Sequence, residues 1–311
     1  MTDIEQPQLN SRQRTRLVKL ASYASLIVAI TLVALKTWGW QTTGSISLLS
    51  SLADSVLDVL ASGITFWAVR YSLSPADSEH RFGHGKSEGV AALAQSLIVA
   101  GSAVFVCLEA VKRLIEPQPI QAPEIGVSVI FIATAATIAL VGFQRYVARR
   151  ANSVAIRADA IHYQADLLVN LGVGISLILT PWIGWMALDP VVGLIVAAFI
   201  LRSAFGIGQR ALEILLDHEI PVHDKQKIKA IALRHPDVQG FHDLKTRFGG
   251  NHYIVQFHLE MEPETSLLRT HEILDNVEDE LRRSYPGCEI IIHADPLGYP
   301  ERRDSFEQTQ D

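Results

Sequence analysis

Long apolar runs fill the first two thirds of the chain, and a pattern typical of a soluble domain replaces them in the last third. Each of six runs is long enough to cross a bilayer, which takes about 20 helical residues. The first run shows no small-residue cleavage site, so it is expected to be a retained membrane helix and not a signal peptide. The predicted spans cover residues 15–39, 45–72, 88–115, 123–148, 156–181 and 188–210.

Basic residues predict the orientation of these spans, since Lys and Arg concentrate on the cytoplasmic side of a membrane. They gather before the first span, between the second and third, and between the fourth and fifth. The first-to-second and fifth-to-sixth connections lack Lys and Arg and hold four of the five tryptophans, as in an outer aromatic belt. Lys112 and Arg113, near the outer end of the third span, run against the pattern. Both termini are therefore predicted to be cytoplasmic.

From Asp217 onwards the pattern predicts helix, strand, strand, helix and strand. Thr265 is the expected cap of the second of these helices. The order α-β-β-α-β predicts a small α+β domain with a sheet covered on one face. The expected organisation is a cytoplasmic tail (1–14), a six-helix transmembrane domain (15–210), a cytoplasmic metal-binding and dimerisation domain (211–298) and a disordered tail (299–311).

Two polar pairs interrupt the apolar helices. Asp54 and Asp58 lie in SLADSVLDVL, and His162 and Asp166 lie in IHYQADLLVN. Each pair has i, i+4 spacing, so both side chains project from one helical face. A charge in hydrocarbon costs roughly 2.5–3.5 kcal/mol on insertion scales, so these groups need a partner. Three carboxylates and one imidazole can close a four-ligand shell around a divalent cation.

The imidazole moves the preference of this donor set from magnesium, calcium or manganese toward zinc, iron or cobalt, and tetrahedral zinc is the first choice. The alternative is a set of bundle-facing acids that hydrogen-bond to neighbouring helices. Asp159 and Asn170 each lie one turn from this set. They are candidates for outer support or an ion pathway, and equally for a helix cap and an interhelical hydrogen bond.

Two further sets of side chains have the chemistry of metal ligands. The loop PADSEHRFGHGKSEG carries Asp77, His80 and His84, which form either a compact site or three solvated residues. In the last third, four histidines and one carboxylate fall where adjacent strands and a helix can bring them together, and a carboxylate among histidines can bridge two cations. Scattered surface histidines are the alternative. The set is His242, His258, His271, His293 and Asp295.

The strings SLADSVLD, HRFGHGKSE and HYQADLLVN, with HDLKTR, FHLEME and IIHADP near the C-terminus, resemble the cation diffusion facilitator family. The resemblance covers about residues 12–298 and is nearest to bacterial ferrous-iron and zinc efflux pumps. It implies a homodimeric, multi-pass protein of the bacterial inner membrane that exports a divalent metal, usually zinc, against inward proton flow. The cargo could also include iron, cadmium, manganese or cobalt.

The family's site residues can be carried over by position. The resemblance then implies a transport site that consists of Asp54, Asp58, His162 and Asp166. It also implies a loop site that consists of Asp77, His80 and His84. The histidines and Asp295 of the last third would form a binuclear regulatory zinc site in a metallochaperone-like domain, with Asp295 bridging. Lys86 and Asp217 match a charged pair that ties the membrane and cytoplasmic parts together at the dimer contact.

Other function classes fit less well. The net charge of −6 does not suggest a nucleic-acid partner. Two cysteines give no disulfide framework and no Cys-x-x-Cys site. The chain lacks His-Glu-x-x-His, and four protein ligands leave a tetrahedral metal no open position, so an enzyme is not expected. A membrane-anchored metal sensor and a passive metal channel remain as alternatives.

Overall fold

The computed structural model describes residues 10–43, 46–115, 124–183, 187–250 and 252–299. The chain divides into two compact units, Met1–Leu215 and Leu216–Asp311. The two expected tails, 1–14 and 299–311, fall mostly outside the described residues.

The first unit is a bundle of six helices, each between 27 and 33 residues long, on which the six predicted spans fall. Within the described ranges, hydropathy and length qualify four helical stretches as membrane spans: 12–42, 87–115, 131–151 and 190–215. Helices α2 and α5, which carry the polar pairs, are 27 and 30 residues long, and the other four have 28 to 33 residues. The helices are α1 (Ser11–Thr43), α2 (Ile46–Ser72), α3 (Ser87–Ile115), α4 (Glu124–Ala151), α5 (Val154–Ile183) and α6 (Leu188–Leu215).

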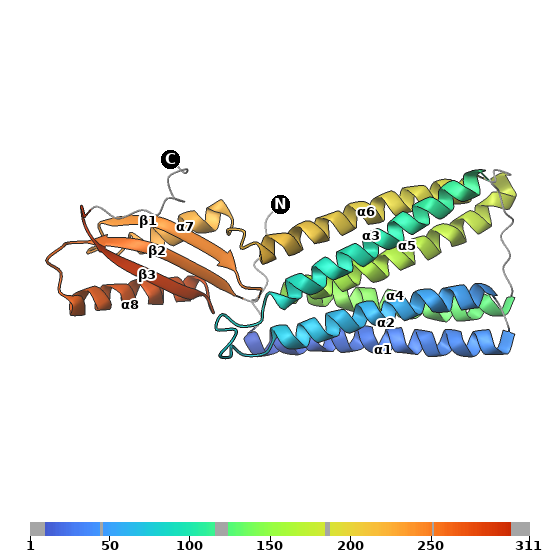
Figure 1. The fold of residues 1–311 in the computed structure, drawn as a ribbon, viewed down its shortest axis with the longest axis horizontal. Coiled ribbons are helices and arrows are strands. Elements are labelled where there is room, and N and C mark those ends of the chain that lie inside the picture. The colour runs from blue at the N-terminus through green and yellow to red at the C-terminus, as the bar shows by residue number, and fades with distance from the viewer. Residues whose placement is uncertain (1–9, 44–45, 116–123, 184–186, 251, 300–311) are drawn as a thin grey trace. The chain divides into compact units, whose positions relative to one another are not determined.

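Small residues bring the helices of the bundle close together. In Figure 1, α1, α2 and α4 lie beside one another, and α3, α5 and α6 form a second group. Ala103, Ala165 and Ala204, from α3, α5 and α6, meet in one buried cluster. Large apolar side chains such as Phe105 and Phe205 point outward and are 68% and 75% exposed. Small residues inside and large apolar residues outside are what a lipid environment favours, because lipid solvates the outer side chains and close packing holds the helices together.

The second unit has the predicted element order, α-β-β-α-β. Strands β1 and β2 pair antiparallel, and β3 joins β2 in parallel after the crossover through α8. Helix α8 is capped by Ser266, whose hydroxyl accepts from the Arg269 N–H, and not by Thr265 as expected. The elements are α7 (Val222–Ala232), β1 (Gly240–Phe248), β2 (Tyr253–Met261), α8 (Leu267–Ser284) and β3 (Glu289–Pro296).

The core of the second unit lies between its helices and one face of the sheet. Val255, Phe257 and Leu259 of β2 are buried there against α7 and α8, whose core residues include Ile228 and Ile273. Successive residues of a strand point to opposite faces, so the intervening residues of β2 lie on the face away from this core. That face carries the predicted cytoplasmic ligands.

Candidate metal sites

Helices α2 and α5 bring three of the four predicted transport ligands together. His162 Nε2 lies 3.0 Å from Asp58 Oδ1 and 3.9 Å from Asp166 Oδ2. One ligand atom from each of the three residues lies within 4.8 Å of the others. The imidazole is buried and the carboxylates are half-buried. Asp58, His162 and Asp166, called here the α2–α5 cluster, thus have the donor types and the spacing that a divalent cation requires.

Asp54 is outside this group of three. It lies one turn before Asp58 on α2, and its side chain is exposed in the isolated chain. Its electrostatic neighbours are Asp58 and Lys36 of α1. The fourth predicted ligand therefore stands at the edge of the cluster, and a side-chain movement would be needed for it to complete a four-ligand shell.

A buried hydrogen-bond network lies next to the α2–α5 cluster and involves Asp159, one turn before His162. Asp159 is fully buried and accepts hydrogen bonds from Gln144 Nε2 at 2.6 Å and from Gln95 Nε2 at 3.3 Å. Tyr163 shares a hydrogen bond with Ser62 at 2.8 Å. Two amide donors satisfy the Asp159 carboxylate, so hydrogen bonds tie it to α3 and α4.

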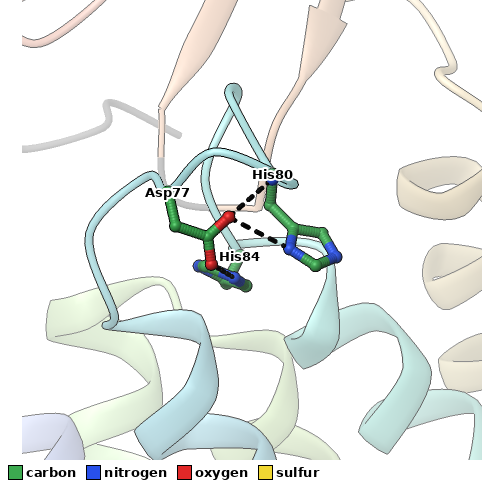
Figure 2. A group of neighbouring side chains, drawn as sticks. All are labelled: Asp77, His80 and His84. Carbon is green, nitrogen blue, oxygen red and sulfur yellow. Dashed lines mark hydrogen bonds and ion pairs between the residues drawn. The ribbon is translucent and has the colours of Figure 1, made fainter.

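The three predicted loop ligands form a compact group between α2 and α3 (Figure 2). The two oxygens of Asp77 divide between the histidines: Oδ1 lies 3.3 Å from His80 Nδ1, and Oδ2 lies 3.2 Å from His84 Nε2. His84 is buried against the ring of Tyr71, whereas Asp77 and His80 are exposed. The Nδ1 atom of His84 is buried without a hydrogen-bond partner among the described residues. This arrangement presents two imidazoles and one carboxylate to a common point.

The loop backbone holds Asp77 in its charged form. The N–H groups of His80 and Glu79 donate to Asp77 Oδ1 at 2.6 and 3.0 Å. The His80 N–H bond is the largest cause that lowers the pKa of Asp77 below its usual value. A metal ligand must be deprotonated, so the turn prepares this carboxylate for a cation.

In the second unit, strand register aligns three predicted histidines across the sheet. His242 pairs with His258, and His258 pairs with His293. Neighbouring ring centroids are 5.1 and 4.7 Å apart. A β-bulge follows His242, with Asp243 in the left-handed region at φ 50°.

Asp295 contacts all three histidines of this row. Its Oδ2 lies 2.8 Å from His258 Nδ1 and 3.6 Å from His242 Nε2, and its Oδ1 lies 3.2 Å from His293 Nε2. Asp295 itself pairs with Glu260, two register positions beyond the pair of His258 and His293. His242, His258 and Asp295, called here the sheet cluster, place their ligand atoms within 4.8 Å of one another. A carboxylate that faces imidazoles with both oxygens has the geometry of a bridging ligand.

The structure places one predicted ligand, His271, outside the sheet cluster. His271 lies on α8, is 70% exposed by its side chain, and pairs with Asp275 at 3.6 Å, away from the sheet cluster. Asp217 lies 3.4 Å from Arg247 within the second unit. Its predicted pairing with Lys86 stays a prediction.

Sequence reasoning missed Lys36, which lies beside the α2–α5 cluster, and two acids beside the sheet cluster. Glu260 Oε1 is 3.2 Å from His242 Nδ1, and Asp243 Oδ2 is 3.6 Å from His258 Nε2. Lys36 could have been found, because it is the one charged residue between Leu20 and Thr43. The two acids gave no such signal, since acidic residues are common in surface strands.

Two family models match the two units of the chain. The family model described as cation efflux transmembrane domain matches residues 22–216, and the model described as cation efflux protein, cytoplasmic domain, matches residues 220–297. The chain belongs to the cation efflux, or cation diffusion facilitator, family. Its first unit is therefore a transmembrane domain, its second unit is the family's cytoplasmic domain, and the protein is a membrane transporter and not an enzyme.

Curated relatives match over almost the whole chain. The cation-efflux pump FieF of Klebsiella pneumoniae is 44% identical over 281 residues, which are 90% of this chain and 93% of that protein. FieF of Pectobacterium atrosepticum is 44% identical over 282 residues, or 91% of this chain and 94% of that protein.

Some of the solved structures that resemble this chain cover about a quarter of it. A chain from the transporter CzrB is 30% identical and covers 25% of this chain and 99% of its own, with a TM-score of 0.25. The metal-bound C-terminal domain of CzcD from Thermotoga maritima is 23% identical and covers 26% of this chain and 100% of its own, with a TM-score of 0.25.

Proposed function

We propose that this protein exports a divalent cation from the cytoplasm in exchange for protons, with Zn²⁺ as the first candidate cargo and Fe²⁺, Cd²⁺, Mn²⁺ and Co²⁺ as the others. The observation that carries the proposal is the α2–α5 cluster, which is held by two helices of a transmembrane domain. The transport site consists of that cluster and Asp54. Two carboxylates lie close to one imidazole within a helix bundle, and the cost of burying their charges is hard to explain unless they share a cation or protons.

Metal and protons compete for the same atoms at this site. Carboxylates and imidazole bind a metal only when deprotonated, so capture from the cytoplasm releases protons. After the site turns to the outside, external protons displace the metal. His162 is the proposed main proton carrier, because imidazole exchanges its proton near neutral pH. Each elementary charge that moves inward contributes about 2.3 kcal/mol per 100 mV, so the exchange ratio decides whether the membrane potential assists export.

The membrane topology belongs to the same proposal. All six helices of the first unit cross the inner membrane, with α2 and α5 in the bundle to present the transport site. Both termini are cytoplasmic, as the distribution of Lys and Arg predicts. The functional boundaries are those expected from the sequence, with the transmembrane domain at 15–210 and the metal-binding and dimerisation domain at 211–298.

The two other clusters are proposed as metal sites outside the bundle. The loop cluster, which consists of Asp77, His80 and His84, and the sheet cluster both combine imidazoles with carboxylate, a donor set that fits Zn²⁺. In the second unit, His242, His258 and His293 would hold zinc with Asp295 as the bridge, and His271 would join through dimerisation. The proposed assembly is a homodimer in which Lys86 and Asp217 pair at the contact, so that zinc bound by the cytoplasmic domain regulates transport.

Metal uptake into proteoliposomes under an imposed pH gradient tests the transport proposal. Wild type and Asp58→Asn would be compared for zinc, iron, manganese and cadmium, with Asp279→Asn as the matched control. Asp279 lies exposed on α8 and outside every cluster. Gradient-dependent zinc uptake that Asp58→Asn abolishes and Asp279→Asn leaves intact is the expected result.

Other outcomes would overturn the proposal in distinct ways. Equal uptake by wild type and Asp58→Asn would remove the α2–α5 cluster from the mechanism. Flux that does not respond to the pH gradient would indicate a channel. No flux of any metal would favour a membrane-anchored sensor, in which the cytoplasmic domain is the working part.

A further inference from the structure

Lys36 is a cation inside the apolar part of α1. It is the one charged residue between Leu20 and Thr43, and that stretch belongs to the helix segment 12–42, which qualifies as a membrane span. An ammonium group in a span is costly and is found where it faces the bundle interior and meets a partner. The contacts of Lys36 therefore indicate what it serves.

Those contacts lead to the transport site. Lys36 Nζ donates a hydrogen bond to Ser55 Oγ at 2.6 Å. Ser55 is fully buried and stands on α2 between Asp54 and Asp58. The carboxylates with which Lys36 interacts electrostatically are Asp58 first, then Asp54 and Asp166. A hydroxyl supplies a hydrogen bond but no opposite charge, so the acids of the transport site are the counter-ions of this ammonium group.

The charge of the site changes when Lys36 is counted. Three carboxylates and a neutral imidazole carry a charge of −3, and one dication leaves −1. With the ammonium group of Lys36 the acids and lysine sum to −2, so one dication brings the site to neutrality. A second dication would make the site positive, and burial in a low-dielectric bundle penalises any unbalanced charge.

We propose that Lys36 is a fixed counter-charge of the transport site. With its positive charge, the site is neutral when one dication is bound, and its repulsion lowers the affinity of the site for that dication. The inference rests on the proposed function, because it requires that the four ligands bind the cargo. An ammonium group has no lone pair to give a metal, so Lys36 acts by repulsion and not as a ligand. A transporter must release its cargo, and a lower affinity of the loaded site for the metal favours that release.

The test is zinc binding to the purified full-length protein at one fixed pH near neutral, where an ammonium group is charged and zinc is soluble. Zinc alone is the probe, measured by equilibrium dialysis. Asp54→Asn identifies the portion of binding that belongs to the transport site. Lys36→Met removes the charge and keeps the aliphatic stem, Lys36→Arg keeps the charge, and Lys19→Met makes the same change at an exposed position of the same helix.

Lys36→Met is expected to lower the zinc Kd of the Asp54-dependent site by tenfold or more, which corresponds to about 1.4 kcal/mol. Repulsion between an ammonium group and a dication within one site is large enough for such a change even when it is strongly screened. In proteoliposomes the same variant is expected to lower KM and kcat together, because tighter binding slows release. Lys36→Arg and Lys19→Met should keep the wild-type values.

Two results would separate the inference from the function on which it rests. Unchanged or weaker zinc binding in Lys36→Met, with the Asp54-dependent site present, overturns the role of Lys36 and leaves the transport site intact. If the wild type has no Asp54-dependent zinc site, the proposed function fails instead. A merely structural role for Lys36 would lower both affinity and protein yield in Lys36→Met, which also contradicts the inference.

Discussion

Replacement of Asp295 by Asn should remove most of the zinc-dependent stability of the cytoplasmic unit. Asp295 faces three histidines, at 2.8 Å from His258, 3.2 Å from His293 and 3.6 Å from His242. The amide keeps the size of the carboxylate and loses its charge and its ability to bridge with two equivalent oxygens. The buried core of this unit lies wholly within it, so the fragment 211–298 is expected to fold by itself.

The magnitude follows from linkage between binding and folding. Zinc at 100 times its Kd stabilises the folded state by about 2.7 kcal/mol. A roughly 100-fold loss of affinity leaves about 0.4 kcal/mol at the same zinc concentration. In a domain of this size each kcal/mol moves Tm by roughly 4–8 °C, so zinc should raise Tm by about 11–22 °C in wild type and by about 2–3 °C in Asp295→Asn.

Thermal unfolding of the fragment, followed by circular dichroism with and without zinc, measures this difference. Asp279→Asn is the matched control, because it makes the same chemical change at an exposed position of α8. Without zinc, the Tm values of the three proteins should be similar. A full zinc-induced rise in Asp295→Asn would refute the bridging role, and no rise in wild type would refute the sheet cluster as a zinc site.

Two further predictions concern buried groups. Gln144→Leu leaves one oxygen of the buried Asp159 without its donor and should destabilise the detergent-solubilised protein by about 1–3 kcal/mol. Gln41→Leu, the same change at an exposed position, should not lower the stability. Equal thermal stability of the two variants would contradict the hydrogen-bond network around Asp159. Burial raises the pKa of the Cys288 thiol to about 11, so iodoacetamide should label Cys288 slowly in the folded fragment at neutral pH, as followed by mass spectrometry, and labelling at the rate of a small free thiol would contradict this. Because the folded pKa is raised above the usual value of 9.0, the contribution of this thiol to stability is fully present below pH 9 and is lost as pH rises to about 11.

The sequence allowed prediction of whatever depends on neighbours along the chain. Six apolar runs correspond to six helices, because the length and hydrophobicity of a run are local properties. The spacing of His162 and Asp166 placed both on one face of α5, since that follows from helical periodicity alone. The order α-β-β-α-β of the second unit was predicted for the same reason, although the cap of α8 moved by one residue, from Thr265 to Ser266.

Tertiary structure decided which of these faces meet. The row of His242, His258 and His293 depends on strand register and on the crossover through α8, and no local pattern specifies either. The position of Asp54 at the edge of the α2–α5 cluster, and of Lys36 beside it, depends on how α1 and α2 pack against each other. Helix periodicity fixes the direction of each side chain about its own axis, but only close packing between helices fixes the neighbours that it finds, and those neighbours set the charge balance of the site.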